Sequence, residues 1–168
     1  TWFSWLNQGV RKTGVGAEDT HNARGTGTPR TLVALSSDDP AQMDVDEVTD
    51  ALREGRAISV QGAFPELWVQ DQPVGAEVSP VGGEVTIRLK VQAPTWVALG
   101  SARLIRNGEP VEVIDLEGLT DPLRLDTTIT RPEAGPAWYA LWVEGDAHPL
   151  APLYGGDTAF SITNPVFV

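Results

Sequence analysis

Strict alternation of apolar and polar residues between positions 85 and 92 constrains the fold of this chain more than any other feature of its sequence. Every second position is apolar, namely Val85, Ile87, Leu89 and Val91. The intervening positions are polar, namely Thr86, Arg88, Lys90 and Gln92. Because successive side chains of a strand point to opposite faces, this pattern predicts an antiparallel strand with one buried and one solvated face.

Strand and turn signals continue through residues 63–168. Asn107-Gly108 separates two apolar runs, and this pair is favoured in the tight turn of a β-hairpin. About seven strands with frequent turns are expected, which is typical of an immunoglobulin-like antiparallel β-sandwich. They cover residues 67–69, 85–91, 102–106, 111–114, 123–129, 138–143 and 160–163.

The run 138–143 is apolar on both faces, so we expect a central strand there. The chain has no cysteine and therefore no disulfide to pin the two sheets. Trp138, Tyr139 and Trp142 are expected to fill the core instead. Trp68 and Trp96 also lie in or beside apolar strands, where core packing is the expected role.

Residues 1–62 combine helix and strand signals. Asp44 can cap a helix, Glu47 stands where a capping box has its acid, and Gly55 can end the helix. The other expected elements are the last turns of a helix at 2–7 and short strands at 31–35 and 57–60. This incomplete set indicates the end of an α/β domain. We therefore expect an α+β chain with a first domain over 1–62 and the sandwich over 63–168.

The start of the chain is rich in apolar side chains that lack a preceding partner, namely Trp2, Phe3, Trp5 and Leu6. It has no initiator Met, no basic leader region and no apolar run long enough for a signal peptide or a membrane span. We expect the chain to begin inside a domain, with these side chains as the contact surface for a missing part.

Charge and cysteine content exclude several classes of function. Lys and Arg number 12 against 23 Asp and Glu, a net charge of -11, which disfavours a protein that binds the phosphate backbone of nucleic acids. The absence of cysteine excludes a thiolate zinc site and a thiol nucleophile. The compartment is left open, cytoplasmic or exported, for a soluble protein.

The chain has two histidines, and His21 has the more informative surroundings. In an extended segment Asp19 and His21 project to the same side, where a carboxylate and an imidazole could bind one metal ion. The alternative is a turn with a capping Asp and a solvated His. His148 precedes Pro149 in a turn-like stretch and is interpreted as a surface residue. No serine has a recognisable triad spacing, so the catalytic residues are unknown.

Several motifs together resemble the C-terminal part of PHP-domain metal-dependent hydrolases of the CehA/McbA-like branch. That branch has an "SDTH" signature, a Gly-x-Pro-Arg-Thr turn, a helix ending in "ALRxGR" and a strand ending in "NGP". The matching segments here are Glu18-Asp19-Thr20-His21, Gly27-Thr28-Pro29-Arg30-Thr31, Ala51-Leu52-Arg53-Glu54-Gly55-Arg56 and Ser59-Val60-Gln61-Gly62. The resemblance covers about the first 65 residues.

The resemblance implies the C-terminal piece of a PHP-type distorted (β/α) barrel followed by the sandwich. Asp19 and His21 would be late ligands of divalent metal ions (Mn, Fe or Zn) in the full-length protein, and Arg30 is predicted to bind substrate. Metal-activated water would hydrolyse an ester-type or phosphoester bond.

Two features limit this expectation. Glu18 stands where the branch has Ser, and its earlier His-x-His ligands are absent from the chain. Two ligands do not hold a catalytic metal, so this chain alone is expected to be inactive and to bind none without the missing N-terminal half, in cis or as a bound cleaved chain. The alternatives are a non-enzymatic sandwich module that binds protein or carbohydrate, and a pseudoenzyme.

Overall fold

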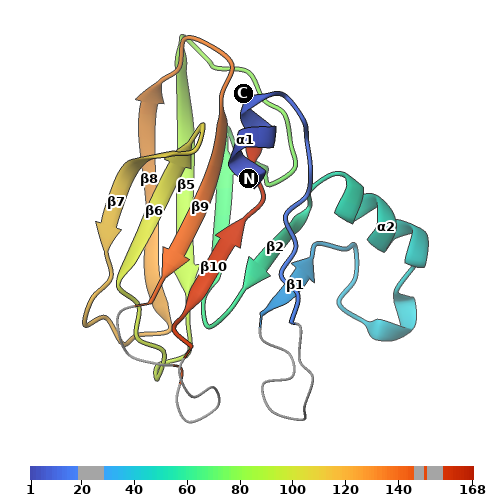
Figure 1. Ribbon diagram of the computed structural model, residues 1–168, viewed down its shortest axis with the longest axis vertical. Coiled ribbons are helices and arrows are strands. Elements are labelled where there is room, and N and C mark those ends of the chain that lie inside the picture. Colours follow the sequence, from blue (N-terminus) through green and yellow to red (C-terminus); the bar gives the residue numbers. More distant parts are fainter. Residues whose placement is uncertain (19–28, 146–149, 151–156) are drawn as a thin grey trace.

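The computed structural model describes residues 1–18, 29–145, 150 and 157–168. These residues form two antiparallel sheets, one of seven strands and one of four, with two short α-helices (Figure 1). The described part of the chain is mostly β, and its strands close no barrel. The antiparallel character expected from the sequence is confirmed; the immunoglobulin-like assignment stays a prediction.

The seven-stranded sheet has the order β1-β2-β10-β9-β6-β7, and β11 also pairs with β9. Its strands are β1 (Arg30–Val33), β2 (Ala57–Val60), β6 (Ser101–Arg106), β7 (Glu109–Asp115), β9 (Trp138–Glu144), β10 (Phe160–Thr163) and β11 (Val166–Phe167). In this sheet β2 pairs with β10 at Ser59 and Ile162, so strands from both ends of the chain share it. The domain boundary at residue 62 stays a prediction.

The four-stranded sheet has the order β4-β3-β5-β8. Its strands are β3 (Phe64–Val69), β4 (Gln72–Pro73), β5 (Glu84–Gln92) and β8 (Leu123–Pro132). The alternation predicted for β5 is confirmed, because its four apolar side chains are all buried between the sheets. The hairpin is confirmed as well: β6 and β7 are joined at Asn107 and Gly108, whose φ angles of 51° and 93° suit a type I′ turn.

The helices are α1 (Trp2–Asn7) and α2 (Val45–Arg53), with a 3-10 turn, η1 (Pro40–Gln42), before α2. The Asp44 side chain caps α2 by accepting a hydrogen bond from the Asp46 N–H, as expected. Glu47 does not complete a capping box; its carboxylate accepts from the Ser36 N–H and hydroxyl, at 2.6 and 3.1 Å. Neither described helix has the length and apolar character needed to cross a membrane.

Strand β9 is buried on both faces, as its sequence predicted. Tyr139, Leu141 and Val143 point between the two sheets, whereas Trp138 and Ala140 belong to a second cluster on the outer face. The expectation that the aromatic residues of this strand are core residues is confirmed for Tyr139 and Trp138, which are both buried but in different clusters, whereas Trp142 is only partly buried against the outer one. Side chains alternate along a strand, so neighbouring aromatic residues cannot share one face.

Helix α1 covers this outer face, and this partly corrects the expectation for the start of the chain. Leu6 is only 4% exposed, and Trp2 and Phe3 pack against the same cluster. The Asn7 amide oxygen accepts from the Trp138 indole N–H at 2.8 Å. Only Trp5 of the four apolar residues is largely exposed, at 52%.

A buried carboxylate joins the two sheets at the end near α1. Glu133, just after β8, receives two hydrogen bonds from Arg106 of β6, at 2.7 and 2.6 Å, and one from the Tyr139 hydroxyl at 2.7 Å. The Arg106 hydrogen bonds lower the pKa of Glu133 to about 2, against the opposing effect of burial. The carboxylate is therefore held ionised inside the sandwich.

Acidification is expected to remove the contribution of Glu133 to stability. Its folded pKa of about 2 lies below the ordinary value of 4.5, so the contribution is present above pH 5 and lost as the pH falls toward 2. It amounts to about 3 kcal/mol. Urea denaturation should show wild type and Glu133→Gln converging as the pH falls from 5 to 2. The matched variant Glu112→Gln, at a half-exposed ion pair, should instead run parallel to wild type.

Docking of α1 on its own sheet is tested by two neighbouring substitutions. Leu6→Ala should lower the free energy of unfolding by about 2–3 kcal/mol, because it leaves a cavity against Trp138. Trp5→Ala, at an exposed position of the same helix, should change it by less than about 0.5 kcal/mol. Equal effects of the two substitutions in chemical denaturation would contradict the docking.

Candidate functional site

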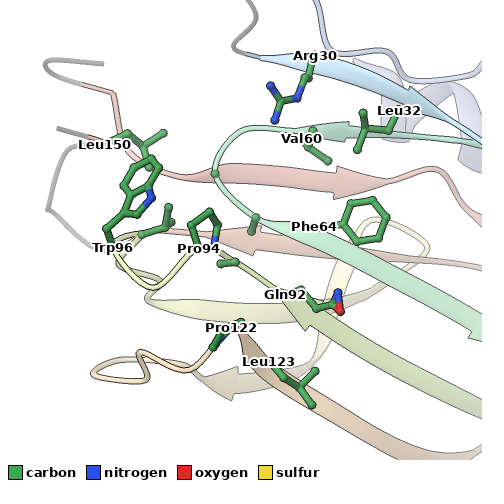
Figure 2. A pocket seen from close by; sticks show the side chains of 14 residues that line it. Arg30, Leu32, Val60, Phe64, Gln92, Pro94, Trp96, Pro122, Leu123 and Leu150 are labelled. Carbon is green, nitrogen blue, oxygen red and sulfur yellow. The ribbon is translucent and has the colours of Figure 1, made fainter. Parts of the chain in front are cut away.

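A pocket of about 580 Å³ lies where the sandwich is open between its two sheets. Leu32 and Val60 of the larger sheet line it, and Phe64 and Gln92 of the smaller sheet face them. Figure 2 shows the Arg30 guanidinium extending from β1 toward the space that these side chains enclose. The pocket therefore combines walls from both sheets.

The chemistry of the pocket is mainly apolar. Arg30 and Gln92 supply the charged and amide groups among the described lining residues. Trp96, in the loop after β5, lines the pocket and is 50% exposed, so the core role expected for it is wrong. Such a lining suits a flat apolar group that carries a negative charge or a hydrogen-bond acceptor.

The position of Arg30 depends on the strand that it begins and on the segment before it. Arg30 pairs with Val60 across β1 and β2. Next to it, Thr31 forms reciprocal hydrogen bonds with Gly16: its hydroxyl accepts from the Gly16 N–H at 3.0 Å and donates to the Gly16 carbonyl at 2.8 Å. Gly16 is required there, since a Cβ would overlap the Ser59 hydroxyl and approach the Arg30 carbonyl oxygen to 2.9 Å.

These contacts hold together the two flanks of the segment that carries the predicted metal ligands. Asp19 and His21 themselves lie outside the described residues, as does His148. Elsewhere in the described ranges, no group of three or more His, Cys, Asp or Glu side chains could hold a metal ion. The structure thus places Arg30 at the pocket. The roles of Asp19, His21 and Arg30 stay predictions.

A second cavity of about 450 Å³ shares Leu32 and Phe64 with the first. Its lining comes from β1 and β2 of the larger sheet and from β3 and β4 of the smaller sheet. We refer to these two cavities, which share two side chains, as the groove; its lining is mainly apolar, with Asp38, Arg56 and Glu66 at the second cavity. The sequence did not predict this groove. The only sequence feature that points to it is the short length of the surrounding strands.

Comparison with known proteins found no matching family model, curated protein or solved structure.

The Gly16–Thr31 contact is tested by removing one hydroxyl. Thr31→Val keeps the shape of the side chain but leaves the Gly16 N–H without its acceptor, so the free energy of unfolding should fall by about 1–2 kcal/mol. Limited proteolysis should also cut faster between residues 16 and 31. Thr128→Val, at an exposed position of β8, is the control and should alter neither measurement.

Proposed function

We propose that this chain is the C-terminal segment of a metal-dependent hydrolase of the PHP superfamily. It would supply Asp19 and His21 as late ligands of a divalent metal centre, together with an accessory β-sandwich of immunoglobulin-like type. The parent enzyme would cleave ester-type or phosphoester bonds.

One observation carries this proposal. The reciprocal hydrogen bonds of Gly16 and Thr31 join the residues on either side of the 17–30 segment, and Arg30, the neighbour of Thr31, lines the pocket on the other face of β1. The segment that contains the two proposed ligands thus ends at a residue that lines a cavity of suitable size for a small substrate. This supports a substrate pocket that adjoins the metal centre.

The residues of the pocket have distinct roles in this proposal. Arg30 would bind a negatively charged or carbonyl oxygen of the substrate, because a guanidinium donates several hydrogen bonds from one plane. The apolar walls around Phe64 and Trp96 would hold the apolar part of the substrate and exclude water. A divalent metal, when bound, supplies the activated water for hydrolysis.

This chain alone should lack hydrolase activity. A catalytic metal site needs three or more protein ligands, and the proposal assigns two to this chain. The N-terminal half of the same domain, in cis or as a bound cleaved chain, would supply the others. Proteins that lack those ligands would be pseudoenzymes of the same architecture.

The apolar groove also favours a second candidate function, a sandwich module that binds a protein or a carbohydrate. Trp96 and Phe64 are both exposed at the groove, and exposed aromatic rings provide contact surfaces for either partner. This function requires neither Asp19 nor His21. Substitution of those two residues therefore separates the two candidates.

Metal analysis of the full-length parent tests the hydrolase proposal. Asp19→Ala and His21→Ala should each lower the bound divalent metal and the esterase or phosphoesterase activity, because each removes a ligand. His148→Ala and Asp50→Ala, the latter at an exposed position of α2, are the matched controls and should retain both. Unchanged metal content and activity in Asp19→Ala and His21→Ala would overturn the proposal and favour the binding module.

A further inference from the structure

A β-bulge places an arginine inside the sandwich behind the pocket. Along the β5–β8 ladder, Val91 faces Leu125 and Gln92 faces Leu123, so Arg124 is the extra residue of β8. The bulge reverses the alternation that the sequence predicts there. Leu123 is 50% exposed and lines the pocket, whereas Arg124 is 4% exposed.

The buried guanidinium binds the loop that forms one wall of the pocket. One nitrogen, Nη2, donates to the carbonyl oxygens of Pro94 at 2.8 Å and Val97 at 3.1 Å. These residues bracket Trp96, and the Val97 N–H donates to the Pro94 carbonyl at 3.0 Å to close the turn. Pro94, Trp96 and Val97 all line the pocket.

Arg124 is a costly residue at this position. Its Nε and Nη1 atoms are buried and have no hydrogen-bond partner. Burial lowers the pKa of Arg124, and the charge of Asp121 opposes this only in part. A buried cation with unpaired N–H groups destabilises a fold, so packing alone does not account for an arginine here. An apolar side chain of similar length would fill the same space without that cost.

We propose that Arg124 is a positioning residue for the pocket. Its two hydrogen bonds hold the 94–97 turn in the conformation that presents Trp96 and Val97 to a ligand. This inference rests on the proposed function only in taking the pocket as a ligand site; the effect of Arg124 on the turn is independent of the ligand.

The variant Arg124→Met separates positioning from stability. Amide hydrogen exchange of Val97, followed by NMR, should be about tenfold faster or more, because the turn loses its two charged hydrogen bonds. The midpoint of urea denaturation should change little, because the removal of two buried nitrogen atoms without a hydrogen-bond partner offsets the loss of the donor to the Pro94 and Val97 carbonyls. Arg131→Met, at a partly exposed ion pair of the same strand, is the matched control and should leave Val97 exchange unchanged.

A dye tests the link to ligand binding. We use 8-anilinonaphthalene-1-sulfonate, whose flat apolar rings and negative charge match the lining and Arg30. Wild type should bind it, and Trp96→Ala and Arg124→Met should each weaken binding about tenfold, whereas Arg131→Met should not.

The outcomes are distinguishable. Unchanged Val97 exchange in Arg124→Met would overturn the positioning role, whatever the dye does. Faster exchange in Arg124→Met, with no dye binding by wild type, would support the positioning of the turn and overturn the pocket as a ligand site. A lower denaturation midpoint together with faster exchange over the whole chain would show a general structural role and would also overturn the inference.

Discussion

The burial of β9 on both faces is the constraint on which the rest of the structure depends. One face, at Tyr139, Leu141 and Val143, packs against the four-stranded sheet, and the other packs against α1. A strand with apolar side chains on both faces must be packed against other elements on both faces. The second cover comes from the opposite end of the chain, because Asn7 binds Trp138 across a sequence separation of 131 residues. The first turns of the chain are therefore part of the same packed body as the last strands.

The candidate site lies where the two sheets of the sandwich are not in contact with each other. On one side β7 and β8 approach each other through Glu112 and Arg131. On the other side the groove lies between the two sheets, with lining from β1 and β2 on one wall and from β3 on the other. Such a pocket forms where the two sheets separate, and no particular side chain is needed to create it. The charged groups there are Arg30, which begins the regularly paired strand β1 and lines the pocket, and Arg124, which a bulge of β8 places behind the pocket wall.

Much of the strand structure could be predicted because its signals are local. The alternation in β5, the Asn107-Gly108 turn and the Asp44 cap each depend on a few neighbouring residues, and all were found in place. The predictions that were wrong concern which neighbour a side chain meets. Glu47 binds Ser36 instead of its own helix end, and Trp96 lines a pocket instead of the core. Asp19 and His21 stay predictions that rest on the sequence motif.

The sequence by itself determined the antiparallel β character and the limits of most elements, because backbone geometry turns residue periodicity directly into buried and solvated faces. Its motifs also predict Asp19 and His21 as metal ligands and Arg30 as a substrate-binding residue, and these roles stay predictions. Only the tertiary structure decided that the two flanks of their segment meet at Gly16 and Thr31, and that a bulge turns Arg124 inward. The first is a contact between a segment outside the strands and β1, and the second depends on the register between β5 and β8; no local sequence pattern encodes either one.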